Sequence, residues 1–300
     1  MIIPIAAVIV VLQVWGSYRT IAKVFKWLTL TLFAYVAAAF LARPHWGEVL
    51  RATLIPHLSF DGKYLLTLMA ILGTTISPYL FFWQASQEVE EEVNMGRKTL
   101  KERKGATDRE LHNAAWDTGV GMIFCNIIFY FVILASAATL HAAGKTEIQS
   151  ATDAAQALKP LAGSAATYLF ALGLIGAGFL AVPVLTGSSA YAVAEMFGWE
   201  YGLDKKPKGA WQFYAVIAVS TAVGMLINFL GINPIAALFW TAVINGLLSP
   251  PLLALIMLVA NNRKVMGKRV NGLGTNIVGW LATAVMFAAA IGMVLTWGKS

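Results

Sequence analysis

The residues best suited to chemistry lie where apolar segments are interrupted. The segment GTTISPY, residues 73–79, places Thr74, Ser77 and Tyr79 around Pro78. Proline inside a helix removes one hydrogen-bond donor and clashes with a carbonyl one turn earlier. A helix broken here exposes carbonyl and hydroxyl oxygens, and transporters use such discontinuous helices to coordinate ions. The alternative is a tolerated kink, in which Thr and Ser satisfy the freed backbone groups.

A second interruption, NGLLSPP, covers residues 245–251 and contains Asn245, Pro250 and Pro251. Two prolines and an amide within one apolar run are unusual for a helix that only spans a bilayer. Asn245 either lines a path or joins neighbouring helices by a hydrogen bond. We therefore predict a second broken helix at Pro250 and Pro251.

Acidic residues concentrate in the joint 85–112, which holds seven of the fifteen acids. A solvated helical hairpin is the favoured interpretation, since a charge run is usually a solvated face. The sharper interpretation is an acidic vestibule that concentrates cations at the mouth of a path. Its candidate members are Glu88, Glu90, Glu91 and, at the start of the next apolar run, Asp117.

Enzyme signatures are absent from the sequence. There is no HExxH, CxxC or GxSxG motif, so we predict that the chain is not an enzyme. No Asp or Glu lies in the middle of an apolar run, although a divalent cation needs hard, preferably anionic oxygen ligands. Either the substrate is not a metal, or the carboxylate lies upstream of this chain.

The composition indicates which kind of secondary structure must position these residues. The chain has 300 residues, of which 58% are hydrophobic and 12% charged, against about 45–50% and about 25% in soluble domains. This favours an all-α, multi-pass membrane protein with about eight transmembrane helices. The expected apolar runs are 1–16, 25–42, 64–84, 114–140, 164–196, 210–230, 233–260 and 276–297.

Basic residues alternate between the joints of these runs. Of the 22 Lys and Arg, 16 lie in the joints 17–26, 85–112, 198–209 and 261–275. The positive-inside rule places these joints in the cytoplasm and both termini outside, so the charge of +7 reports orientation and predicts no nucleic-acid partner. Because the first run is short and has no leader, we expect further helices upstream.

Several motifs together resemble the Nramp (SLC11-type) divalent metal transporters, in particular their Nramp-related bacterial branch. They are GTTISPYLFFWQASQEVEEE, TDRELHNAAWDTG, AVPVLTGSSAYAVAE and NGLLSPPLLAL. The resemblance implies a partial LeuT-type inverted-repeat fold that lacks the first three helices. Within a single transmembrane domain, 1–300, residues 1–63 would hold two helices and an outer loop, 64–260 the second repeat, and 261–300 a terminal extra helix.

The resemblance also implies a metal site, half of which lies in the missing part. Thr74 would contribute its carbonyl, Ser77 replaces an expected thioether ligand, and Tyr79 replaces a histidine linked to proton movement. Asn245 lies one turn beyond Ala242, which replaces a polar glutamine. A hydroxyl favours harder ions than a thioether does, so we expect tolerance of Mg²⁺ or Mn²⁺ and question strict proton coupling.

The resulting prediction is a secondary transporter, or a fragment of one, in the bacterial inner membrane. It would move divalent ions such as Mn²⁺, Fe²⁺ or Mg²⁺ by alternating access, with no resident cofactor; protons are candidate co-substrates. Its partners would be the metal ion and the lipid bilayer, with no protein partner specified. The alternatives are a LeuT-type carrier of an organic solute and a non-transporting truncated membrane protein.

Overall fold

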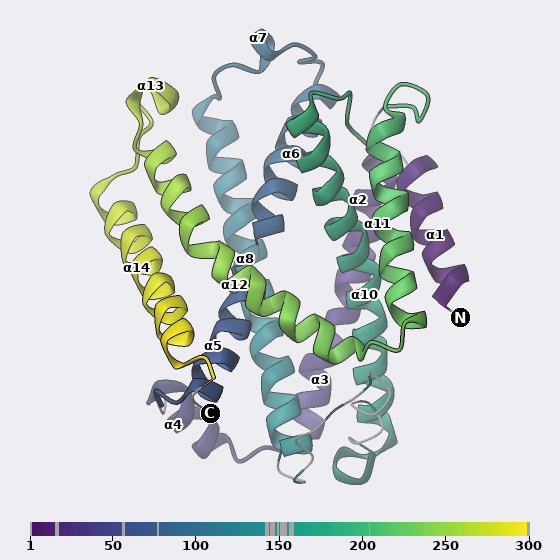
Figure 1. The fold of residues 1–300 in the computed structure, drawn as a ribbon, viewed down its shortest axis with the longest axis vertical. Helices are drawn as coiled ribbons and strands as arrows, with labels where there is room; N and C mark the ends of the chain where they lie inside the picture. The colour runs from purple at the N-terminus through teal and green to yellow at the C-terminus, as the bar shows by residue number, and fades with distance from the viewer. Residues whose placement is uncertain are drawn as a thin grey trace. The chain divides into compact units, whose positions relative to one another are not determined.

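The computed structural model describes residues 2–15, 18–55, 58–76, 78–141, 159–203 and 205–298, with positions 144, 148, 150 and 155. All regular elements in these ranges are helical (Figure 1). They are α1 (Ile2–Trp15), α2 (Tyr18–Thr29), η1 (Leu30–Leu32), α3 (Phe33–Leu41), α4 (Trp46–Leu54), α5 (Gly62–Thr75), α6 (Pro78–Asn94), α7 (Leu100–Arg103), α8 (Asp108–Ser136), η2 (Ala137–His141), α10 (Lys159–Phe197), α11 (Trp211–Phe229), α12 (Pro234–Ala260), α13 (Arg263–Met266) and α14 (Leu273–Thr296).

Five helical stretches of the described chain are long and apolar enough to cross a membrane. They are Lys23–Leu41, Asp108–His141, Thr167–Phe197, Pro234–Ala260 and Leu273–Thr296. This confirms the prediction of an all-helical, multi-pass membrane protein. The other three expected runs form shorter elements: α1 has 14 residues, the run 64–84 is divided between α5 and α6, and α11 has an apolar part at Trp211–Ile227.

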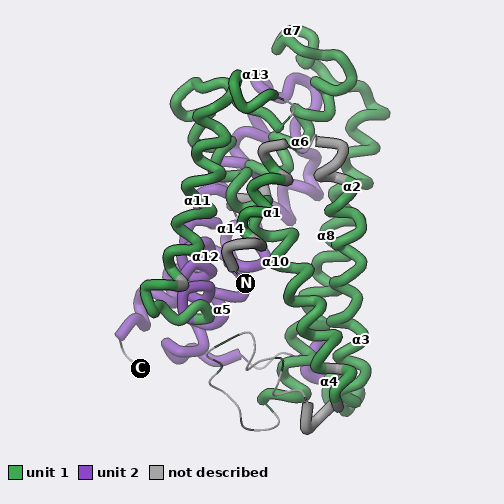
Figure 2. The backbone as a smooth tube through the Cα atoms, turned by 90° about the vertical axis from the view of Figure 1, so that its right-hand side faces the viewer, with its two compact units in different colours: residues 1–49, 82–235 green, residues 50–81, 236–300 purple. Residues whose placement is uncertain are grey.

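Two compact units divide the chain (Figure 2). Unit 1 comprises residues 1–49 and 82–235, and unit 2 comprises residues 50–81 and 236–300. The units follow spatial contacts, whereas the segments 1–63, 64–260 and 261–300 predicted above follow the order of an inverted repeat and stay predictions.

Unit 1 has its core where α3 packs on α8 and α10, and where α10 packs on α11. The ring of Tyr35 on α3 meets that of Phe170 on α10 edge to face, with centroids 5.3 Å apart. A Cβ on Gly173 would lie 2.9 Å from the Tyr35 ring, so the glycine allows this close approach. Small residues let helices pack tightly where lipid, which is itself apolar, provides no hydrophobic driving force.

Unit 2 has its core among α5, α12 and α14. Its buried members are Leu65, Met69, Ala70, Val243, Met286, Ala290 and Met293. Gly73 of α5 lies directly against α12, because a Cβ there would collide with the carbonyl oxygen of Ala242 and the backbone nitrogen of Gly246. The two backbones therefore touch just before the end of α5.

Side-chain caps fix two helix starts within the acidic joint. Thr99 and Glu102 form a capping box on α7, and Thr107 and Glu110 form another on α8. Glu110 also accepts a 2.5 Å hydrogen bond from Arg97. The joint thus contains capped helices, and its interpretation as a solvated hairpin stays a prediction.

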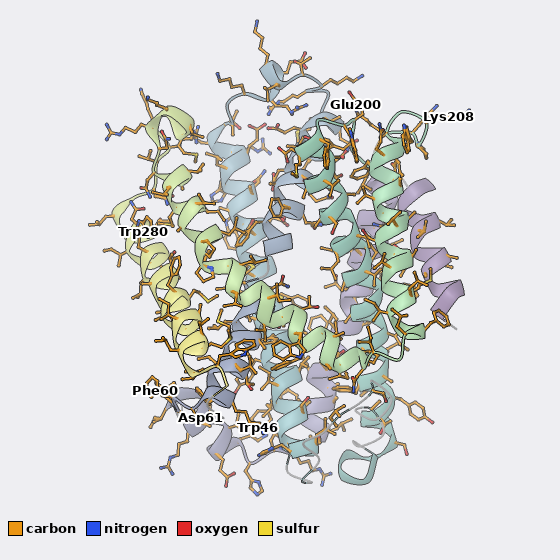
Figure 3. The ribbon with its side chains drawn as sticks, in the orientation of Figure 1. Trp46, Phe60, Asp61, Glu200, Lys208 and Trp280 are labelled. Atoms are coloured by element: carbon orange, nitrogen blue, oxygen red, sulfur yellow. The ribbon has the colours of Figure 1, made fainter. Side chains whose placement is uncertain are left out.

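The start of α5 is capped by Asp61, which Figure 3 labels beside Phe60. Its carboxylate accepts hydrogen bonds from the Ser59 hydroxyl at 2.5 Å and from the Tyr64 backbone N–H at 2.9 Å. The Ser59 bond first, and then the Tyr64 bond, lower the pKa of Asp61 because both stabilise the ionised form. The cap sets where α5 begins, fourteen residues before the break described below.

Candidate functional site

The helical chain is interrupted between α5 and α6. α5 ends at Thr75, Ile76 adopts φ −111° and ψ 71°, and α6 begins at Pro78. Proline suits the first position of a helix because its fixed φ is helical and its missing N–H would have no partner there. Pro78 has no N–H, so it cannot give the carbonyl of Thr74 the bond that a continuous helix would supply.

The hydroxyls before the break bond to their own helix. Thr74 donates to the carbonyl of Ala70 at 2.9 Å, and Thr75 donates to the carbonyl of Leu72 at 2.9 Å. Both hydroxyls therefore form hydrogen bonds within α5. The ligand predicted at Thr74 is its backbone carbonyl and not this hydroxyl. Ser77 lies outside the described residues, and of Pro78 and Tyr79 the structure describes only the backbone.

Ser249 of α12, for which the sequence predicted no role, lies against the break. Its hydroxyl is fully buried and donates to the carbonyl of Ile76 at 2.5 Å, sharing its proton with the carbonyl of Asn245 at 2.7 Å. The sequence signal that could have found this role is the position of Ser249, one helical turn after Asn245 on the helix with two prolines. The break is thus braced by a buried hydroxyl from 173 residues away.

The predicted interruption of α12 is not observed. The helix runs from Pro234 to Ala260 through Pro250, which is buried, and Pro251, which is exposed. Figure 1 shows α12 changing direction along its length without losing its helical form. Prolines are tolerated in membrane helices when local adjustments and neighbouring groups satisfy the freed carbonyls. Asn245, on the same helix, is half-buried.

The four predicted vestibule acids do not share one environment. Glu88 is half-buried and accepts a hydrogen bond from Gln84 at 3.0 Å, while Glu91 and Asp117 are exposed. Glu90 is only 6% exposed and accepts hydrogen bonds from Tyr191 and Leu203. The vestibule assignment is therefore corrected for Glu90: packing of α6 against α10 takes its carboxylate out of water.

A cavity of about 460 Å³ lies within unit 1 among α1, α10 and α11. Apolar side chains form much of its wall, with hydroxyls from Thr186, Ser189, Ser220 and Thr221. Beside it the buried Gln13 donates to the carbonyl of Pro183 at 3.0 Å and accepts from Thr186 at 3.2 Å. This uncharged lining suits a small organic molecule better than a metal ion.

Acidic, histidine and cysteine side chains do not assemble into a metal cluster in the part of the chain that the structure describes. No group of three or more of them lies close enough together to hold an ion. The ligand roles predicted for Thr74, Ser77, Tyr79 and Asn245 therefore stay predictions.

The relatives found by comparison with known proteins include three bacterial proteins, each named divalent metal cation transporter MntH. The protein of Klebsiella pneumoniae is 24% identical over 258 residues, covering 84% of this chain and 56% of that protein. The protein of Clostridium acetobutylicum is 28% identical over 272 residues, covering 88% and 57%. That of Caldanaerobacter subterraneus is 25% identical over 289 residues, covering 96% and 64%.

The chain therefore spans less than two thirds of the length of these relatives. A model of the family described as "Nramp: Natural resistance-associated macrophage protein-like" matches residues 1–296. The family is one of transporters, which confirms that the chain is not an enzyme. Because this match covers nearly every residue and agrees with the apolar helices and the broken segment, the chain belongs to the Nramp family.

Proposed function

We propose that the chain forms part of a secondary transporter that moves divalent metal ions across a bacterial inner membrane by alternating access. The observation that carries the proposal is the interruption between Thr75 and Pro78, because discontinuous helices present backbone oxygens to transported ions. Membership of the Nramp family and the names of the MntH relatives support a metal as the substrate. The fold we propose is a partial LeuT-type inverted repeat of about eight spans.

The proposed ligands are the carbonyl of Thr74, the side chains of Ser77 and Tyr79, and the amide of Asn245. All four belong to unit 2, in which α5 and α12 pack backbone to backbone. Hydroxyl, carbonyl and amide oxygens are hard ligands, so they favour Mg²⁺ and Mn²⁺ over softer metals. Glu88, Glu91 and Asp117 would gather cations near the path as exposed or half-buried charges.

Uptake into proteoliposomes tests this proposal. Purified protein should accumulate Mn²⁺, Fe²⁺ and Mg²⁺, with Mg²⁺ transported measurably. Ser77→Met should shift the ratio of Mn²⁺ to Mg²⁺ uptake by about tenfold toward Mn²⁺, because a thioether replaces a hard ligand. Thr67→Met, on the exposed side of the same helix pair, should leave the ratio unchanged.

Two results would count against it. Unchanged selectivity in Ser77→Met would remove Ser77 from the ligand set. Absence of uptake for all three metals would show that this chain does not transport them on its own and would favour a non-transporting membrane protein. An organic-solute carrier is the second candidate, because the 460 Å³ cavity of unit 1 is uncharged and largely apolar, with a few hydroxyls in its wall. Uptake of a labelled neutral amino acid, reduced by Thr221→Val, would support it.

A further inference from the structure

Glu90 is a buried carboxylate that is not among the proposed metal ligands. Its neighbours Glu88, Glu91 and Glu92 on α6 are exposed or half-buried, whereas Glu90 itself is 6% exposed. An ionised carboxylate removed from water is tolerated only when it is paired or well hydrogen-bonded. The surroundings of Glu90 therefore need to supply donors, and they come from two other segments of unit 1.

Both donors reach the same oxygen. The hydroxyl of Tyr191, on α10, donates to Glu90 Oε1 at 2.7 Å, and the backbone N–H of Leu203 donates to it at 2.8 Å. Tyr191 is 2% exposed and Leu203 is 3% exposed, so solvent does not compete for these bonds. Hydrogen bonds to a charged acceptor are stronger than those between neutral groups.

The loop after α10 is shaped to approach this carboxylate. Gly202 adopts φ +132°, and a Cβ on it would lie 2.7 Å from Glu90 Oε1. Only glycine combines that backbone conformation with so close an approach. The loop is also held from α11, because the Tyr214 hydroxyl donates to the carbonyl of Lys205 at 2.8 Å.

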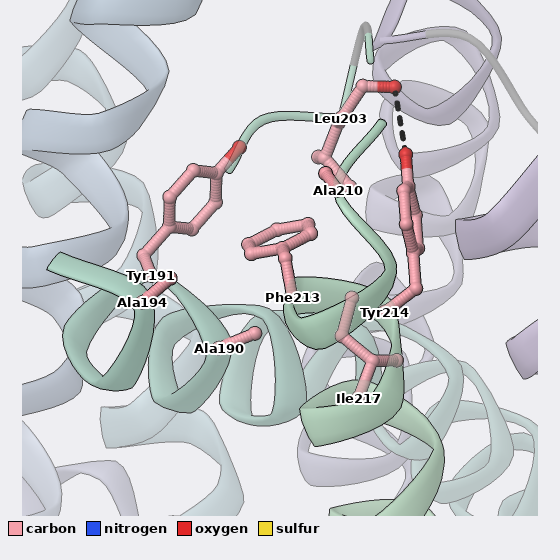
Figure 4. Packing of buried hydrophobic residues seen from close by; sticks show 8 residues of the cluster. All are labelled: Ala190, Tyr191, Ala194, Leu203, Ala210, Phe213, Tyr214 and Ile217. Carbon is pink, nitrogen blue, oxygen red and sulfur yellow. Dashed lines mark hydrogen bonds between the residues drawn. The ribbon is translucent and has the colours of Figure 1, made fainter. Parts of the chain in front are cut away.

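Aromatic packing fixes the Tyr191 donor. Its ring meets that of Phe213 at 4.9 Å and that of Trp83, on α6, at 6.2 Å, both edge to face. Figure 4 shows Phe213 of α11 between Tyr191 of α10 and Tyr214 of α11. Trp83 in turn lies against Gly187, where a Cβ would collide with the indole. The hydroxyl is therefore aimed by a rigid cluster and has little freedom to leave the carboxylate.

These contacts join α6, the helix that begins at the break, to α10 and to the loop 198–205. We propose that Glu90 is a positioning residue: it fastens α6 to α10 and to this loop, so that a change at the break is transmitted to the loop. The transmission of a change from the break to the loop rests on the proposed function. The fastening of α6 to α10 and the loop does not, because it depends only on contacts within unit 1.

Hydrogen–deuterium exchange of the full chain in lipid nanodiscs tests the fastening without metal. Glu90→Gln should speed exchange in the peptide 198–205 by about tenfold, since the amide oxygen of Gln is a weaker acceptor for the Leu203 N–H than a carboxylate oxygen. Tyr191→Phe, which keeps the ring packing, should speed it by a smaller factor. Glu195→Gln, an exposed carboxylate on the same helix as Tyr191, should change nothing. Unaltered exchange in both Glu90→Gln and Tyr191→Phe would overturn the fastening.

Adding Mn²⁺ tests the transmission. In the wild type, Mn²⁺ should alter exchange in peptides of α6 and in the peptide 198–205 together. In Glu90→Gln the response of α6 should remain and that of the loop should be lost, with a lower maximal uptake rate and an unchanged KM for Mn²⁺. A loop response that survives in Glu90→Gln would overturn the transmission. If Mn²⁺ affected no wild-type peptide, the proposed function and the transmission would both fail, while the metal-free comparison would still decide the fastening.

Discussion

The hydroxyl of Ser249 lies 2.5 Å from the carbonyl oxygen of Ile76, the last described residue before the break between α5 and α6. Ser249 is fully buried, and it stands on the helix that contacts Gly73 backbone to backbone. The Ser249 hydroxyl therefore donates a hydrogen bond to a carbonyl at the point where the hydrogen bonds of the α5 helix end. The carbonyl of Ile76 is therefore already hydrogen-bonded, whereas the carbonyl proposed as a ligand is that of Thr74.

Removing this hydroxyl should destabilise unit 2. Ser249→Ala leaves the carbonyl of the half-buried Ile76 without this donor, at a cost of about 1–3 kcal/mol. Thermal unfolding in detergent measures the loss. Thr241→Ala is the matched control, because that exposed hydroxyl bonds only to its own helix, at Ala237, 2.8 Å away. Equal melting temperatures for the two variants would show that Ser249 does not brace the break.

Gly73 should tolerate no side chain. In Gly73→Ala the new Cβ collides with the backbone of α12 at Ala242 and Gly246, and backbone atoms cannot rotate away. We expect destabilisation of at least about 1–3 kcal/mol from overpacking. Gly178→Ala on α10 should be neutral or stabilising, because nothing lies within 4 Å of its Cβ position and alanine favours helices. Melting temperatures of both variants check this contrast.

The polar contact of Gln13 should stabilise unit 1. Its amide links α1 to α10 by donating to Pro183 and accepting from Thr186, and it is 1% exposed. Gln13→Leu removes both bonds within a buried setting and should cost about 1–3 kcal/mol. Val11→Leu, at a position 53% exposed on the same helix, should cost far less. The prediction fails if unfolding of the two variants occurs at the same temperature.

The Asp61 cap should make stability depend on pH. Hydrogen bonds from Ser59 and Tyr64 hold the pKa of Asp61 below its ordinary value. A lowered folded-state pKa means that the cap contributes stability above the unfolded-state pKa, near about 4, and loses it as pH falls through the folded-state pKa. Asp61→Asn keeps a cap without a charge, so it should flatten this acid limb of the melting curve. If Asp61→Asn lost as much melting temperature at acid pH as the wild type does, the acid dependence would come from other carboxylates.

Local features of the sequence were sufficient for the protein class, the family and the position of the break. Long apolar runs specify membrane helices because each must satisfy its own backbone hydrogen bonds in lipid. Pro78 cannot donate a helical hydrogen bond, because proline has no backbone N–H whatever its surroundings. The family match confirmed the family, the five apolar helices confirmed the class, and the end of α5 before Pro78 confirmed the first break. The ligand roles of Thr74, Ser77, Tyr79 and Asn245 stay predictions.

The tertiary structure decided which polar groups are buried and what they bond to. Glu90 differs from Glu88 and Glu91 only in that α10 and the loop at Gly202 pack over it, and those partners lie more than 100 residues away. Likewise, Ser249 braces Ile76 across 173 residues, and α12 continues through two prolines that looked like a break. The physical reason is that burial and hydrogen-bond satisfaction depend on neighbours in space, whereas apolar run length and proline chemistry belong to the chain itself.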